Sequence, residues 1–249
     1  MSEEARELRV IPVPGLPEIE AEAKLGETIS ARAELSDGDV IVIAQKAVSK
    51  AEDRVIPLSS AIPGAEARRL AAVLGKEPAL VQLILEESKE VLRAERGVLI
   101  TETHHGFVCA NAGIDTSNLP EADTVCLLPP DPDASARRIR REIVAPTVAV
   151  VIADSFGRAW RLGQSEVAIG CAGLTPLDDW RGREDANGRK LEATMIAIAD
   201  EAAAAADLVR GKDSRVPAVI VRGLARFVTL DDGPGAASLR RPHQEDLFR

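Results

Sequence analysis

Four short runs of aliphatic residues stand out along the chain, and each is bounded by polar or small residues. They are residues 39–44 (DVIVIA), 97–101 (GVLIT), 147–153 (TVAVVIA) and 218–222 (AVIVR). The runs are nearly continuous in valine, isoleucine and leucine instead of alternating with polar residues. This pattern predicts strands that are buried on both faces of a sheet.

Longer segments between these runs have the composition of helices. The predicted helices are residues 25–35, 65–74, 78–92, 132–143 and 190–209. Proline opens two of them and glycine follows the end of two others, as is usual at helix ends. Residues 157–188 and 223–241 are glycine-rich and polar with no clear period, so we expect ordered loops with a functional role there.

The order of the predicted elements bears on fold class and domain organisation. Strands and helices do not alternate regularly, which favours an α+β fold over an α/β fold. No charged linker divides the 249 residues. We therefore expect residues 1–249 to form a single domain, or two interlocked lobes that share a continuous core.

Charge and cysteine content narrow the class of protein. Forty acidic residues against 31 basic ones give a net charge of −9, which disfavours nucleic acid and anionic membranes as partners. Three cysteines without CxxC spacing suggest no disulfide framework. The longest apolar runs reach about half of the ~20 residues that a membrane-spanning helix needs. We expect a cytoplasmic protein.

Two strand ends carry candidate chemistry. Lys46 and Lys50 follow the first run and suit phosphate oxygens. Asp154 and Ser155 end the third run, where a strand can hold side chains rigidly at a Mg²⁺ or Mn²⁺ site, and Arg158 follows. A surface lysine pair and a solvated strand end are the alternative interpretations.

A third candidate is the segment 113–118 (GIDTSN), whose carboxylate Asp115 suits a hard cation, although an ordinary Asx turn uses the same residue types. The sequence contains neither GxxxxGK[ST] nor GxGxxG, so a bound nucleotide is not held by a P-loop or a Rossmann turn. No GxSxG motif supports a serine triad.

Taken together, these segments resemble the coenzyme F-420 gamma-glutamyl ligase family over nearly the whole chain. The matching stretches are residues 14–18 (PGLPE), 37–40 (DGDV), 46–52 (KAVSKAE), 113–118 (GIDTSN), 128–136 (LPPDPDASA), 152–161 (IADSFGRAWR), 163–164, 167–170 (VAIG), 200–212 and 222–224 (RGL). The resemblance implies a family-specific α+β fold with a buried mixed or antiparallel sheet, two lobes and an intertwined homodimer. The apolar stretches 167–174 and 219–224 add support as surfaces that pack between subunits.

The resemblance also implies an activity. Members of the family are GTP-dependent ligases that join the carboxylate of the F-420 precursor's lactate end to the amine of L-glutamate, and then add a further gamma-linked glutamate. They use Mg²⁺ or Mn²⁺, with two divalent ions expected, and K⁺ as a helper. The expected ligands and partners are therefore GTP, L-glutamate, the deazaflavin precursor and a second copy of the chain.

Site residues are carried over by position. The nucleotide contacts implied by the resemblance are Leu16, Pro17, Glu18, Ile19, Gln45, Lys50, Asn118, Gly211 and Lys212. The implied metal ligands are Asp115, Asp154 and Ser155, the last in place of a threonine. Lys50 and Arg158 are the expected catalytic cations, and Lys46 is expected to tolerate substitution better than Lys50.

The chemistry expected of such a site is transfer of the γ-phosphoryl group to the precursor carboxylate. The resulting acyl phosphate is then attacked by the glutamate amine while water is excluded. Two other functions use similar residues. One is a metal-dependent nucleotide phosphohydrolase, and the other is a non-catalytic nucleotide- or deazaflavin-binding protein.

Overall fold

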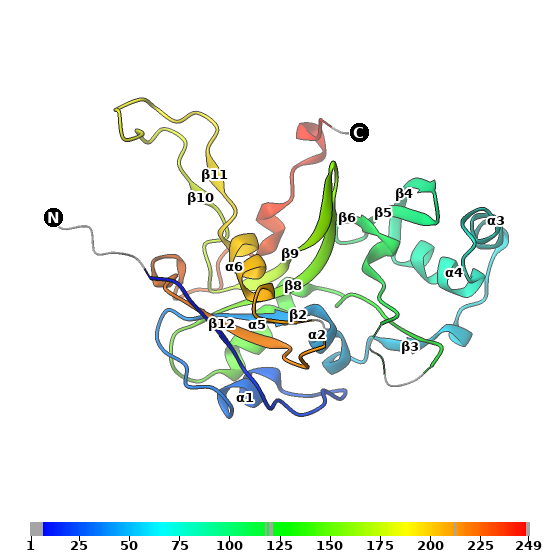
Figure 1. Ribbon diagram of the computed structural model, residues 1–249, viewed down its shortest axis with the longest axis horizontal. Helices are drawn as coiled ribbons and strands as arrows, with labels where there is room; N and C mark the ends of the chain where they lie inside the picture. Colours follow the sequence, from blue (N-terminus) through cyan, green and yellow to red (C-terminus); the bar gives the residue numbers. More distant parts are fainter. Residues whose placement is uncertain (1–6, 118, 120–121, 212, 248–249) are drawn as a thin grey trace.

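A five-stranded mixed sheet lies at the centre of the chain (Figure 1). The computed structural model describes residues 7–117, 119, 122–211 and 213–247. The strand order is β1 (Arg9–Pro12), β12 (Ala218–Arg222), β2 (Val40–Ala44), β8 (Ala149–Arg158) and β9 (Arg161–Ala172). Only β2 and β8 run parallel, and the other neighbours in this sheet pair antiparallel.

Both faces of this sheet are covered. Ile41 and Ile43 belong to a cluster with α1 (Leu25–Ser30), α2 (Gln45–Ala51) and α5 (Pro132–Glu142). Val40 and Val42 belong to a second cluster with α6 (Ile198–Asp207) on the opposite face. The prediction that the aliphatic run 39–44 is a strand buried on both faces is therefore confirmed, with β2 beginning at Val40.

A third cluster of buried residues lies to one side of the main sheet (Figure 1). It is formed by two helices, a three-stranded sheet and a two-stranded sheet. These elements are α3 (Ala65–Leu74), α4 (Pro78–Glu86), β4 (Ser88–Glu95), β5 (Val98–Thr103), β6 (Val108–Ala110), β3 (Val55–Pro57) and β7 (Thr124–Cys126). The α+β class is confirmed.

Three of the predicted helices are clearly shorter than expected. Helix α1 ends at Ser30 instead of residue 35. Helix α4 stops at Glu86 because Ser88–Glu95 pairs with β5 as a strand. Helix α6 begins at Ile198 and ends at Asp207, short of Gly211, and the residues before it include the short strand β11 (Met195–Ile196). Strand pairing, which a helix-like composition does not report, sets the end of α4 and the start of α6.

Residues 157–188 are predicted to form a loop, and this prediction is wrong for the first part of the segment. Residues Arg161–Ala172 form β9, which pairs with β8 as a long hairpin that extends beyond the sheet (Figure 1). Beyond it, β11 and β10 (Asp178–Asp179) pair at the base of an extended loop. Strands β9 and β12 account for most of the stretches 167–174 and 219–224. Val167 and Leu224 are partly buried and the other apolar side chains of these stretches are buried, so the stretches add little support for a surface between subunits.

The remaining short elements are 3-10 turns. They are Leu58–Ser60, Asn111–Gly113, Ala225–Phe227, Ala236–Leu239 and His243–Glu245. No helix in the described ranges has the length and apolar character needed to cross a bilayer.

Candidate functional site

The parallel pairing of β2 and β8 brings two of the candidate strand ends together. Ala44 is the register partner of Ala153, so α2 starts beside the point where Asp154 follows in β8. Carboxyl ends of parallel strands are where open sheets commonly bind ligands. The lysines that follow β2 therefore lie beside Asp154. The expectation that Asp154 and Ser155 end their strand is wrong, because β8 continues to Arg158 in its hairpin with β9.

Lys46 lies on the first turn of α2 and contacts the GIDTSN segment. Its Nζ is 2.8 Å from Asp115 Oδ2 and also donates to the backbone and hydroxyl oxygens of Ser117. Burial acts to raise the pKa of Asp115, but hydrogen bonds from Lys46 and Ser117 outweigh it and hold the pKa below its ordinary value. Asp115 is therefore a carboxylate at neutral pH.

The backbone holds Asp115 in place. The amide of Asp115 donates to the carbonyl of Cys126 at 3.0 Å, and the amide of Cys126 donates to the carbonyl of Asp115 at 2.8 Å. A backbone fixed in this way gives the carboxylate a defined direction, as a ligand site requires.

Lys50 lies one helical turn after Lys46 and pairs with the side chain of Glu18. The structure thus brings together Lys50 and the loop of residues 16–19, all of which are predicted nucleotide contacts. Within that loop Glu18 and Pro17 are exposed, whereas Ile19 is buried in the core and Leu16 packs against it.

Gln45 has a different environment from its neighbours. Its side chain is buried, and Nε2 donates to Ser49 Oγ at 2.6 Å and to the carbonyl of Leu127 at 3.1 Å. Ser49 belongs to α2 itself, and the bond to Leu127 joins this helix to the chain just after β7. Gln45 therefore anchors the helix that carries both lysines, and a nucleotide contact by this residue stays a prediction.

Asp154 and Ser155 point to opposite faces of β8. Asp154 is two residues from both Ile152 and Phe156, so its side chain shares a face of the strand with theirs. Ile152 and Phe156 pack in the α1–α2–α5 cluster. Ser155 instead donates from Oγ to the buried carboxylate of Glu166, its register partner on β9. A single metal ion could not be held by both side chains, so the two would serve separate ions.

The Ser155 side of the strand contains a buried ion pair. Glu166 Oε2 is 2.7 Å from Arg210 Nη2, and both side chains are more than nine-tenths buried. Gly211 follows Arg210 directly and is exposed. The predicted nucleotide contact Gly211 is in this way connected to Ser155 through two buried charged residues.

The charge of Asp154 acts on the other side of the strand. Burial, and then the charge of Asp154, raise the pKa of the Cys109 thiol to about 12, against a smaller opposing effect of the Gly113 backbone. Cys109 lies on β6, which leads into the segment that holds Asp115. Asp154 therefore faces the same part of the molecule as Asp115.

Among the remaining predicted residues, Arg158 is described by the structure and lies away from this site. Arg158 is exposed near the hairpin tip and donates to the carbonyls of Leu162 and Gly163. It is four residues from Asp154, or roughly 13 Å along an extended strand. Asn118 and Lys212 fall outside the described residues.

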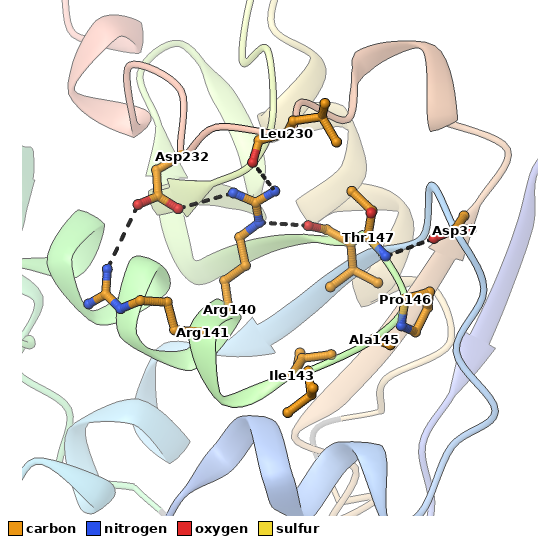
Figure 2. A pocket seen from close by; sticks show the side chains of 11 residues that line it. Asp37, Arg140, Arg141, Ile143, Ala145, Pro146, Thr147, Leu230 and Asp232 are labelled. Carbon is orange, nitrogen blue, oxygen red and sulfur yellow. Dashed lines mark hydrogen bonds and ion pairs between the residues drawn. The ribbon is translucent and has the colours of Figure 1, made fainter.

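Two cavities are lined by described residues other than the predicted site residues. The larger, about 600 Å³, surrounds Arg140 (Figure 2). Every donor nitrogen of Arg140 is already bonded to the protein. Its acceptors are the carbonyls of Val148, Thr229, Leu230 and Asp231 and the carboxylate of Asp232. This arginine therefore ties helix α5 to the chain at 229–232 and has no donor left for a ligand.

The smaller cavity, about 490 Å³, lies between the start of α5 and the chain near the C-terminal end. Its lining residues are His104, His105, Pro130, Asp131, Pro132, Asp133, Arg137, Ile169, Pro234, Ala237 and Arg240. We call it the arginine cavity.

Known proteins are similar to this chain over the segments that form most of the site. The family described as F420-0:Gamma-glutamyl ligase matches residues 15–223, which include most of the site residues described above. The chain belongs to this ligase family. The resemblance inferred from the sequence is therefore confirmed.

Individual relatives agree with the family match. The coenzyme F420:L-glutamate ligase of Methanothermobacter thermautotrophicus is 48% identical over 220 residues, covering 87% of this chain and 86% of the relative. The protein of the same name from Methanocaldococcus jannaschii is 46% identical over 86% of each chain. That from Archaeoglobus fulgidus is 45% identical over 97% of this chain and 96% of the relative.

The predicted metal ligands of this family member are chemically suited to a divalent ion. Two carboxylates and a hydroxyl are hard oxygen donors of the kind that Mg²⁺ and Mn²⁺ prefer. Within the described ranges, no three or more His, Cys, Asp or Glu side chains gather in a way that would hold a metal ion. Ions at this edge would therefore take further oxygens from substrate or water, as Mg²⁺ usually does.

Sequence reasoning missed Glu166 and Arg210. Glu166 precedes an apolar stretch, VAIGCA, and Arg210 immediately precedes a glycine that was singled out. Glu166 could have been found from the sequence, because a lone carboxylate beside a buried apolar stretch needs a polar partner. Its pairing with Ser155 depends on hairpin register, which the sequence pattern did not reveal.

Proposed function

We propose that this protein adds L-glutamate to the deazaflavin coenzyme F420 precursor, and then adds a further gamma-linked glutamate. The observation that carries the proposal is the sheet edge where α2 and Asp154 meet, in a chain that matches the ligase family over residues 15–223. Relatives 43–48% identical to this chain carry the name coenzyme F420:L-glutamate ligase.

GTP is the proposed phosphoryl donor. The loop 16–19 and Lys50 lie together, and an ammonium group beside that loop suits phosphate oxygens. In this proposal the phosphate displaces Glu18 from Lys50, because the exposed carboxylate forms only a weak ion pair in water. Leu16 and Ile19 support the loop from the core side.

The proposed reaction runs through an acyl phosphate. An oxygen of the precursor carboxylate attacks the γ-phosphorus and GDP leaves. The glutamate nitrogen then attacks the acyl carbon, and the C–N bond forms as the bond to phosphate breaks.

The predicted site residues have separate roles in this reaction. Asp115 and Asp154 would hold one Mg²⁺ or Mn²⁺ ion, and Ser155 would serve a second ion, with K⁺ as a helper. Lys50 would offset the charge of the phosphate. Arg158 would add a second positive charge beside the phosphate only if the hairpin tip moved toward the site.

Mass spectrometry of the purified protein with precursor, GTP, Mg²⁺ and L-glutamate tests the activity. We expect products heavier by one and then two glutamate residues. Omitting glutamate and adding hydroxylamine should yield a precursor hydroxamate together with GDP, because hydroxylamine intercepts an acyl phosphate. GTP hydrolysis that ignores the precursor would favour the phosphohydrolase, and binding without turnover would favour a carrier.

We also propose that the protein acts in the cytoplasm as an intertwined homodimer, with each chain forming one domain of two interlocked lobes. Leu162, 97% exposed near the hairpin tip, and Met195, an exposed residue of β11, are apolar side chains that a second subunit would cover. Light scattering at micromolar concentration should give twice the chain mass of 26.5 kDa. A monomer would disprove the dimer without affecting the ligase assignment.

A further inference from the structure

The arginine cavity contains two cations, Arg137 and Arg240, that have no acidic partner among the described residues. Neither Arg137 nor Arg240 forms an ion pair with a carboxylate in the described part of the chain. Arg240 instead lies over the ring of Phe107, with its Cζ 5.5 Å from the ring centroid. In a protein with a net charge of −9, two arginines at one cavity without acidic partners are unusual.

The carboxylates that line the same cavity are already bonded to backbone amides. Asp133 accepts from the amides of Cys171, Ala236 and Ala237 at 2.7 to 3.1 Å. Asp131 caps helix α5 with one oxygen, which accepts from the amide of Ala134 at 2.9 Å. Asp133 is thus held by three amides, whereas the second oxygen of Asp131 is not used by this cap.

His105 supplies a hydrogen-bond acceptor that has no partner. Its Nε2 is 2.9 Å from the carbonyl oxygen of Pro129, which can only accept, so Nε2 carries the proton. In the neutral imidazole Nδ1 then carries a lone pair, and it is buried with no hydrogen-bond partner among the described residues. A buried acceptor of this kind calls for a donor from a ligand.

The cavity adjoins the predicted reaction site. Ile169 in its wall lies on β9, and the neighbouring register pair is Ala153 with Ala168, directly before Asp154. On another side, His105 stacks on Phe107, and Phe107 meets Phe156 edge-on at 6.1 Å between ring centroids. Phe156 and Asp154 share a face of β8, so a ligand in the cavity lies on the Asp154 side of the strand.

We propose that the arginine cavity binds L-glutamate. Two guanidinium groups match the two carboxylates of this amino acid, and the His105 lone pair with the Asp131 carboxylate matches its ammonium group. A cavity of about 490 Å³ falls within the range usual for small-molecule sites. The proposal rests on the proposed function for the choice of amino acid, because the charges alone define only an acidic, amine-bearing ligand.

The first test measures steady-state kinetics of Arg137→Gln and Arg240→Gln. Each variant should raise the KM for L-glutamate at least about tenfold, since a charge-assisted hydrogen bond is lost, and should leave the KM for GTP within about twofold. Arg69→Gln is the matched control, because Arg69 is exposed on α3 and pairs with Glu66 in its own helix. A rise in the KM for the precursor instead, or no change in any KM, would overturn the proposal.

The second test needs neither turnover nor a variant. Hydrogen exchange of the unmodified protein, followed by mass spectrometry, should show slower exchange at residues 131–137 and 234–240 when L-glutamate is added. L-Glutamine and 2-oxoglutarate, which lack one carboxylate and the ammonium group respectively, should protect less. Protection elsewhere, equal protection by all three compounds, or none would refute glutamate binding here. Protection by glutamate in a protein without ligase turnover would instead mean that the proposed function fails and the cavity assignment stands.

Discussion

The two faces of strand β8 differ in how their charged groups are satisfied. On the Ser155 face, Glu166 and Arg210 form an ion pair buried within the protein, on the side of the sheet that helix α6 covers. On the Asp154 face, the charged groups of Lys46 and Asp115 are partly exposed, and the arginine cavity holds cations without acidic partners among the described residues. The comparison indicates that the Ser155 face stabilises the fold and the Asp154 face binds ligands, although Asp154 and Ser155 are consecutive residues.

The largest expected effect is on the scaffold face. Glu166→Gln should lower the free energy of unfolding by about 3–5 kcal/mol, because it leaves Arg210 buried without its charged partner. Chemical denaturation measures this loss. The double variant Glu166→Leu with Arg210→Met is the control and should recover much of the stability. A loss below about 1 kcal/mol in the single variant would mean that the pair is more hydrated than its burial indicates.

On the ligand face, Asp154→Asn should reduce kcat/KM by about 100-fold or more while leaving the unfolding temperature nearly unchanged. An amide has almost the same shape but brings no negative charge to a divalent ion. Asp179→Asn, on the exposed strand β10, is the control for a general effect of lost charge. Activity within a few-fold of the unmodified protein would remove Asp154 from the metal site.

The lysines of α2 separate two roles on that same face. Lys50→Ala should raise the apparent KM for GTP roughly tenfold, as expected for loss of one charged hydrogen bond to phosphate. Lys46→Ala should affect this KM less and should change the concentration of Mg²⁺ needed for half-maximal rate, because Lys46 contacts Asp115. Equal rises in the KM for GTP at both positions would show that the lysines act as one diffuse positive patch.

The smallest expected effect concerns two buried thiols. Burial raises the pKa values of Cys109 and Cys171 from 9.0 to about 12, with further contributions from Asp154 at Cys109 and from Asp133 and Asp200 at Cys171. The unfolded thiols ionise first as pH rises, so their contribution to stability is complete below pH 9.0 and is lost between 9.0 and about 12.

Unfolding temperatures measured at about pH 7.5 and about pH 10.5 test this expectation. The fall between the two should be smaller in Cys109→Ala and in Cys171→Ala than in the unmodified protein. Asp154→Asn should reduce the fall slightly, because it removes one charge that disfavours the Cys109 thiolate. Identical falls in all four proteins would show that these thiols titrate near their ordinary values.

Much of the site could be predicted because its residues follow conspicuous strands. The run 39–44 identified the strand before Lys46 and Lys50, and the run 147–153 identified the first part of the strand that contains Asp154. Buried strands rich in β-branched residues are a strong local signal. The helix 65–74 was likewise predicted to the residue, since a left-handed Gly75 ends it.

The sequence by itself determined the strands and helices with strong periodicity or composition, the family, and the residues that bear candidate chemistry. Tertiary structure decided which of those residues meet. The parallel register of Ala44 with Ala153 joins the lysines to Asp154, and the hairpin register pairs Ser155 with Glu166. Alternation along β8 then sends adjacent side chains to opposite faces, and only the packing on each face makes one a scaffold and the other a ligand site. Register and packing depend on contacts between residues far apart in the chain, which local pattern does not encode.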